Sequence, residues 1–332
     1  MNEQVTSGPI FPAFDVCDNC GRTDWGSERP KLCQGCKVVK YCNRECQKAS
    51  WQRHRWRFRI MCRSAPPSEM EMSPQDIGYS TPMTAGRALH DWYIIHQWSL
   101  GAIGDAIVRL HGGINSLLES SAPRTIVFTV KAVGARESVE SGGNPATAFK
   151  LINITIMPNN EHYATVERGS EMLEHRNQLN MILEAGGQSV DDPMFAGLFC
   201  AAHVVNKTGV VNHEFFGLYR FPLRHVPDDV SNPRTRRALV QSVEFLSRLI
   251  ASGVVLRYER NAPSPEPERG RYVRTRASWR FQPIQDDWES LGSLPGNVAG
   301  QRMELAAREM VTLFDASGSL LRFRLTGTDV FY

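Results

Sequence analysis

Apolar residues recur at steps of three and four between residues 89 and 114, which is the repeat of one face of a helix. This stripe consists of Leu89, Trp92, His96, Leu100, Ile103, Ile107, Leu110 and Ile114. The period predicts a long amphipathic helix that begins near residue 84, and Gly112 and Gly113 mark its end. Because His96 lies within the apolar stripe, we expect it to be a hydrogen-bonded core residue.

Other segments are β-branched and alternate between apolar and polar residues, which predicts strands. These segments are "TIVFTVKAV" from Thr125, "FKLINITIM" from Phe149, residues 197–205, residues 210–221, "GVVLRYER", "RYVRTRASWRF" and residues 319–325. The sequence "NKTG" between residues 205 and 210 predicts a hairpin. The polar, proline-rich stretch "NAPSPEPERG" predicts a loop.

Three further helices are expected, at residues 170–184, 233–250 and 300–313. Long helices combined with hairpin-linked strands favour an α+β domain over an alternating parallel sheet, and we assign it to residues 84–332. Residues 64–83 hold four prolines and little periodicity. This composition predicts a linker, or a segment that lies on the surface.

The first 63 residues carry a dense run of metal-binding side chains after a short extended lead, residues 1–16. Seven of the eight cysteines and one histidine fall within residues 17–62. These residues are Cys17, Cys20, Cys33, Cys36, Cys42, Cys46, His54 and Cys62. A structural zinc ion takes four nitrogen or sulfur ligands, so eight ligands indicate two closed sites with no position left for catalytic water.

Disulfide bonds are the alternative use of these cysteines. The N-terminal residues "MNEQVTSGPIFPAFDV" contain neither the basic region nor the apolar region of a signal peptide. We therefore expect an intracellular protein, in the nucleus or the cytoplasm, whose thiols stay reduced and available for zinc.

The segment "LCQGCKVVKYCNRECQKASWQRH" resembles the core of an MYND-type zinc finger. The resemblance implies a small two-zinc, cross-braced finger over residues 17–63, with a short helix from Glu45 to about Arg55. It also implies two interleaved ligand sets. Cys17, Cys20, Cys42 and Cys46 would hold the first zinc, and Cys33, Cys36, His54 and Cys62 the second.

One spacing departs from the family pattern. Family members usually have His-x3-Cys at the end, whereas seven residues separate His54 from Cys62 here. On a continuous helix this step spans about 12 Å, too far for two ligands of one zinc ion. Either the chain bends between Arg55 and Met61, or Cys62 is not the last ligand.

The resemblance also implies a binding function. MYND-type fingers bind short proline-rich peptides, and Gln47 and Trp51 occupy the positions that match the peptide-binding residues. These two side chains lie four residues apart, on one face of the expected helix. Gln34 stands where family members often have Ser, so the peptide preference is expected to differ.

The charge distribution raises a nucleic-acid hypothesis. Residues 1–63 hold 12 Lys and Arg against 6 Asp and Glu, and "RHRWRFR" alternates arginines with aromatic residues. Seven thiolates and two zinc ions would, however, halve this positive excess. We therefore favour a protein partner over nucleic acid. No apolar run approaches 18 residues, so we expect no membrane-spanning segment.

A catalytic role for residues 84–332 is the competing hypothesis. The sequence contains no GxGxxG motif after a strand, no P-loop, no HExxH and no GxSxG. Some lysine methyltransferases carry an MYND finger inside a SET domain, but only sixteen residues precede Cys17. Their downstream Asn-His-Ser-Cys motif is matched at two positions only, by Asn212 and His213. We therefore expect a zinc-binding adaptor protein and not an enzyme.

Overall fold

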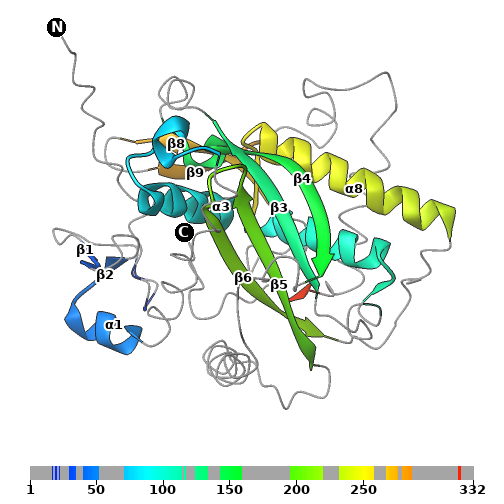
Figure 1. The fold of residues 1–332 in the computed structure, drawn as a ribbon, viewed down its shortest axis with the longest axis horizontal. Coiled ribbons are helices and arrows are strands. Elements are labelled where there is room, and N and C mark those ends of the chain that lie inside the picture. Colours follow the sequence, from blue (N-terminus) through cyan, green and yellow to red (C-terminus); the bar gives the residue numbers. More distant parts are fainter. Residues whose placement is uncertain are drawn as a thin grey trace, which may run out of the picture.

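The computed structural model describes the chain in segments. They comprise residues 17, 19–20, 22, 30–34, 40–51, 71–113, 116, 124–133, 143–158, 195–219, 232–257, 267–275, 279–285 and 321–322. The predicted lead, the predicted helices at 170–184 and 300–313, and most of the strand predicted at 319–325 lie outside these residues. Described residues from 71 onward are called the larger unit below (Figure 1).

A five-stranded mixed sheet forms the centre of the larger unit. Its strands, in spatial order, are β10 (Leu321–Arg322), β6 (Val211–Tyr219), β5 (Phe195–Val205), β3 (Arg124–Ala132) and β4 (Phe149–Pro158). The β3–β5 pair is parallel and the other neighbours are antiparallel. The predicted hairpin across "NKTG" is confirmed, because β5 and β6 pair directly in this register.

Helix α3 (Pro82–Leu110) crosses behind this sheet (Figure 1). Its start is fixed by a capping box, in which the Thr81 hydroxyl accepts from the Thr84 N–H at 3.2 Å and the Thr84 hydroxyl accepts from the Thr81 N–H at 3.0 Å. Its end is followed by Gly112 and Gly113, whose φ angles of 94° and 75° favour glycine. The predicted long helix and its glycine stop are thus confirmed.

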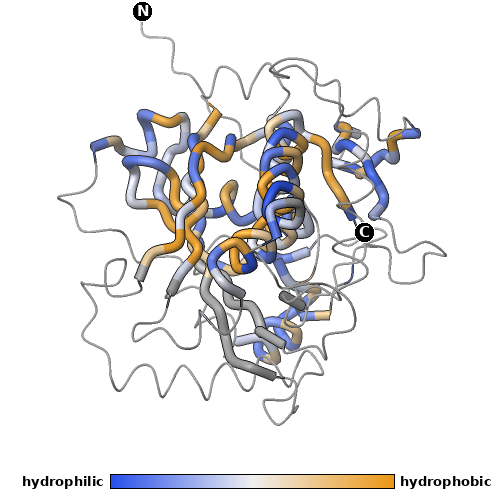
Figure 2. The backbone as a smooth tube through the Cα atoms, turned by 90° about the vertical axis from the view of Figure 1, so that its right-hand side faces the viewer, coloured by the Kyte–Doolittle hydropathy of each residue, from blue (hydrophilic) through white to orange (hydrophobic). Residues whose placement is uncertain are grey.

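The main apolar core lies between α3, the sheet and helix α8 (Pro233–Ala251). Alternating orange and blue along the tube in Figure 2 follows the amphipathic pattern of these helices. The largest core side chains with almost no exposure include Leu89, Trp92, Ile103, Ile126, Phe149, Leu239 and Leu249. Apolar residues of α3, α8, β3, β4 and β5 therefore converge in one cluster, as the periodicity of these segments indicated.

His96 is a buried, hydrogen-bonded core residue, as predicted. Its side chain is fully buried, and Nε2 donates to the Ala146 carbonyl oxygen at 2.8 Å. Ala146 belongs to the 3-10 helix η3 (Pro145–Thr147), just before β4. Burial lowers the His96 pKa to about 4, because a charged imidazolium loses its hydration there, and the hydrogen bond to Ala146 offsets only part of this effect.

A second, three-stranded antiparallel sheet consists of β7 (Val255–Arg257), β8 (Glu268–Arg274) and β9 (Trp279–Pro283). The prediction of one continuous strand over "RYVRTRASWRF" was wrong, because this segment contributes to two paired strands. Strand β8 also begins inside the predicted loop, at Glu268. A Cβ atom on Gly270 would lie 2.3 Å from the Phe281 ring, so the close approach of β8 and β9 there requires glycine.

The described residues of the segment that was predicted to be a linker, or to lie on the surface, pack against the larger unit. Residues 74–77 form the 3-10 helix η2, which is capped by Ser73 and Asp76. Ile77 joins the main core, and the Tyr79 ring stacks on Phe149 at a centroid distance of 6.0 Å. The larger unit therefore begins by Glu71, whose N–H donates to the Lys207 carbonyl at 3.0 Å, and not at residue 84.

Within the described segments, no helix is both long and apolar enough to cross a membrane.

Candidate metal centre

Two short strands build the scaffold of the N-terminal site. Strand β1 (Lys31–Leu32) pairs antiparallel with β2 (Lys40–Tyr41), and Cys17 forms a bridge to Lys40. Cys33 directly follows β1, and Cys42 directly follows β2. Because the strands run in opposite directions, these two cysteines leave the ladder at opposite ends.

A short helix carries Cys46, another of the predicted ligands. Helix α1 (Arg44–Ala49) starts at Asn43, whose side-chain oxygen accepts from the Cys46 N–H at 2.9 Å. This N-cap bond fixes Cys46 on the first turn of the helix, close to Cys42. The helix predicted from Glu45 to about Arg55 is confirmed at its start, but its predicted end is wrong, because α1 ends at Ala49 with Ser50 as its C-cap. Trp51 therefore lies beyond the end of α1 and does not share a face of that helix with Gln47.

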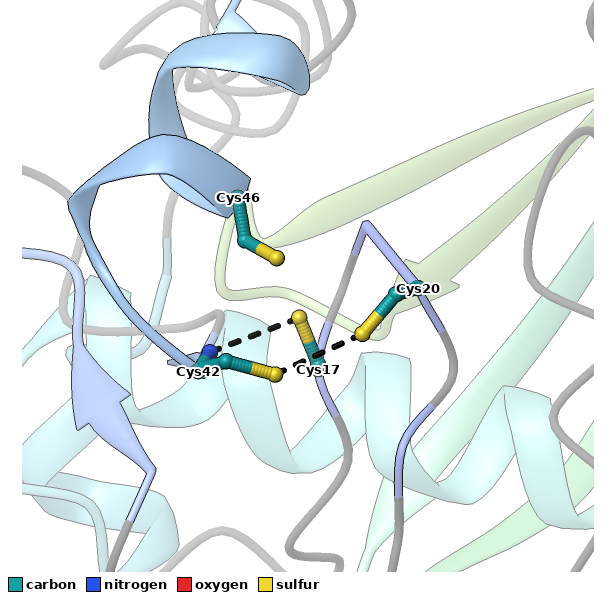
Figure 3. A group of neighbouring side chains, drawn as sticks. All are labelled: Cys17, Cys20, Cys42 and Cys46. Atoms are coloured by element: carbon teal, nitrogen blue, oxygen red, sulfur yellow. Dashed lines mark hydrogen bonds between the residues drawn. The ribbon is translucent and has the colours of Figure 1, made fainter.

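Four cysteine side chains converge from these elements (Figure 3). The Sγ atoms of Cys17, Cys20, Cys42 and Cys46 all lie within 4.8 Å of one another. Cys20 Sγ and Cys42 Sγ are 3.4 Å apart, and all four cysteines are free of disulfide bonds. The structure thus brings together the four residues of the first predicted ligand set.

The donor set fits a zinc ion. Four sulfurs at 2.3 Å from a tetrahedral zinc are spaced by about 3.8 Å, which is compatible with the observed cluster. A four-thiolate set is characteristic of structural zinc rather than of magnesium or calcium, which take oxygen ligands.

Electrostatics gives an independent reason for a cation at this position. Burial raises the pKa of Cys17, but N–H groups of Cys20, Cys42 and Asn19 outweigh it and lower that pKa to about 7. Burial and the neighbouring sulfurs raise the pKa values of Cys42 and Cys46, because adjacent thiolates repel one another. A divalent cation would relieve this repulsion and let all four thiols ionise.

Only one residue of the second predicted ligand set, Cys33, is among the described residues. Cys33 is buried, at 3% exposure, and is not part of the four-sulfur cluster. Its Sγ accepts a hydrogen bond from Gln47 Nε2 at 3.5 Å. Cys36, His54 and Cys62 lie outside the described residues, so the second site remains a prediction.

The two predicted peptide-binding residues have different surroundings. The Trp51 side chain is 46% exposed, although most large apolar side chains described in the structure are buried. The Gln47 side chain is half-buried and directed to Cys33. Trp51 is thus the more exposed of the two predicted peptide-binding residues.

Comparison with known proteins identifies this segment. Residues 17–57 match the family model of the MYND finger. The matched segment includes seven of the eight predicted ligands, His54 among them, whereas Cys62 lies five residues beyond its end. The remainder of the chain has no family match. Neither a curated protein nor a solved structure matches the chain.

The sequence interpretation of the MYND-type finger missed two structural roles. Asn43 caps α1, and the signal for it was available, because Asn is a preferred residue immediately before a helix. The contact of Gln47 with Cys33 had no such signal. It joins side chains that are fourteen residues apart, and it depends on how α1 packs against the end of β1.

Proposed function

We propose that this protein binds two zinc ions through its MYND-type finger and uses the finger to bind a proline-rich segment of a partner protein. In this proposal the larger unit has no catalytic role, and the protein acts as an adaptor. The four-sulfur cluster supports the first zinc. The family match, which includes Cys33, Cys36 and His54, supports the second.

The exposed Trp51 ring is the single observation that supports partner binding most directly. The Trp51 side chain is 46% exposed, so its indole ring buries little apolar surface and contributes little to the stability of the finger. Aromatic surfaces suit proline-rich segments, because a polyproline helix is already extended and loses little conformational entropy on binding.

The experiment compares Trp51→Ala with the unchanged chain in binding to proline-rich peptides. Loss of an aromatic anchor at an interface costs roughly 2 kcal/mol or more, which corresponds to a loss of affinity of about thirtyfold. We expect this loss in isothermal titration calorimetry, while zinc content remains two ions per chain.

Val273→Ala is the matched control, because Val273 is also an exposed apolar residue, at 38%, but lies in β8. It is expected to bind the peptide normally. If Trp51→Ala loses zinc together with peptide binding, the indole supports the fold of the finger, and the peptide must bind elsewhere.

A further inference from the structure

The side chain of Gln47 connects two parts of the MYND-type finger. Its helix α1 also carries Cys46, a member of the four-sulfur cluster. Its amide Nε2 donates to Sγ of Cys33, which lies outside that cluster. Adjacent residues of one helical turn therefore contact two different groups of metal-binding cysteines.

This contact constrains the orientation of the amide. A glutamine side chain offers two N–H donors on nitrogen and acceptor sites on oxygen, and a sulfur acceptor selects the nitrogen. Once one N–H is directed to Cys33, the carbonyl oxygen and the second N–H are left for other partners. The half-buried position of Gln47 leaves part of the side chain accessible to them.

Metal binding would strengthen this contact. A thiolate accepts a hydrogen bond more strongly than a thiol does, because the acceptor carries a charge. Hydrogen bonds to metal ligands orient those ligands, and loss of such a bond typically reduces metal affinity by roughly 10–100-fold.

We infer that Gln47 is a positioning residue that couples peptide binding to the second zinc site, with its N–H held by Cys33 and its carbonyl oxygen presented to the backbone of the partner. This inference rests on the proposed function for its peptide half. Its metal half rests on the second zinc ion of that proposal and on the observed contact between Gln47 and Cys33.

Gln47→Glu in the full-length protein tests the coupling. Glutamate keeps the shape and the acceptor oxygen, but its carboxylate cannot donate to Cys33 and repels a thiolate there. We expect one of the two zinc ions to be released at least tenfold faster to a chelator, while the other is released at the unchanged rate. In the cobalt-substituted protein, the sulfur-to-metal absorption band of one site should shift.

Gln47→Met and Glu45→Gln complete the design. Methionine also lacks the donor but adds no charge, so it should reproduce the faster release and exclude repulsion as its cause. Glu45→Gln makes the reverse exchange, from carboxylate to amide, at an exposed position of α1. It should change neither the rate of zinc release nor the cobalt spectrum.

Two outcomes separate the inference from the proposed function. Unchanged zinc release and cobalt spectrum in both Gln47 variants would overturn the inference, even if peptide affinity falls, because Gln47 would then be a peptide contact only. Altered release without any peptide binding by the unchanged protein would support the metal half. It would refute the peptide-binding part of the proposed function together with the peptide half of the inference.

Discussion

Different interactions stabilise the MYND-type finger and the larger unit. Among the described residues of the finger, the buried apolar side chains are Cys17, Cys33 and Tyr41, and two of these are predicted zinc ligands. The larger unit instead buries a continuous cluster from α3, α8 and the five-stranded sheet. In the finger, metal coordination takes the place of an apolar core.

This difference has a consequence for stability. A segment of this size cannot bury enough apolar surface to fold alone, so the free energy of zinc binding is the free energy of folding. The described core of the larger unit is apolar, and among the described elements the extensive contacts stay within one region or the other. We therefore expect two unfolding units with different sensitivities.

The largest expected effect is that of Cys42→Ser. Cys42 belongs to the four-sulfur cluster, with its Sγ 3.4 Å from that of Cys20, and serine oxygen is a poor replacement for a zinc-bound thiolate. The finger should unfold and zinc content should fall, as measured by metal analysis and by amide hydrogen exchange. The same substitution at Cys200, in β5, should leave zinc content unchanged.

Asp105→Ala should affect only the larger unit. Asp105 and Arg109 form a buried ion pair at 3.1 Å, with side-chain exposures of 0% and 5%. Removal of the carboxylate takes this partner away from a buried guanidinium group, which costs about 3–5 kcal/mol of unfolding free energy. Urea denaturation checks this loss. Glu71→Ala, which removes an exposed contact with Lys207, should cost less than about 1 kcal/mol.

His96 should make the larger unit less stable in mild acid. Its pKa is about 4 in the folded state and about 6.5 in an unfolded chain, so the unfolded state binds more protons between these values. Stability should therefore fall as the pH drops from about 6.5 towards 4, by roughly 2 kcal/mol between pH 7 and pH 5.

Urea denaturation of the larger unit at both pH values measures this effect. His96→Gln keeps a donor for the Ala146 carbonyl but does not titrate, so its stability should depend less on pH. An equal pH dependence in the two proteins would exclude His96 as the cause.

Ile77→Val gives the smallest expected effect and tests where the larger unit begins. Ile77 lies in η2 and joins the main core, so the loss of one methylene group should cost about 0.5–1.5 kcal/mol. Thermal denaturation of the larger unit measures it. Ile152→Val, at a side chain that is 50% exposed, should have almost no effect. If both variants are neutral, residues 71–83 contribute no stability to the larger unit.

Strong periodicity made most elements of the larger unit predictable. The helices α3 and α8 and the strands β3 to β6 were all found from their apolar patterns. The hairpin between β8 and β9 was missed because residues 275–278, "TRAS", contain no glycine, proline, asparagine or aspartate to signal a turn. For residues 71–83, composition left a linker and a surface segment as alternatives, because the order of this segment comes from tertiary contacts of Ile77 and Tyr79.

For the candidate metal centre, the ligands were predictable from the sequence but the contacts around them were not. Ligand spacing identified the cysteines, and the family resemblance grouped the four that the structure brings together. The pairing of Gln47 with Cys33 depends on the packing of a helix against a strand end, and no spacing rule encodes such a contact.

Removal of zinc, followed by hydrogen exchange along the chain, tests most directly whether metal alone holds the finger together. After chelation, amides of β2 and α1 should exchange at once, whereas those of α3 and β3 should keep their protection. Re-addition of zinc should restore the lost protection. Simultaneous loss of protection in α3 and β3 would contradict the claim, because it would show that the larger unit depends on the finger for its fold.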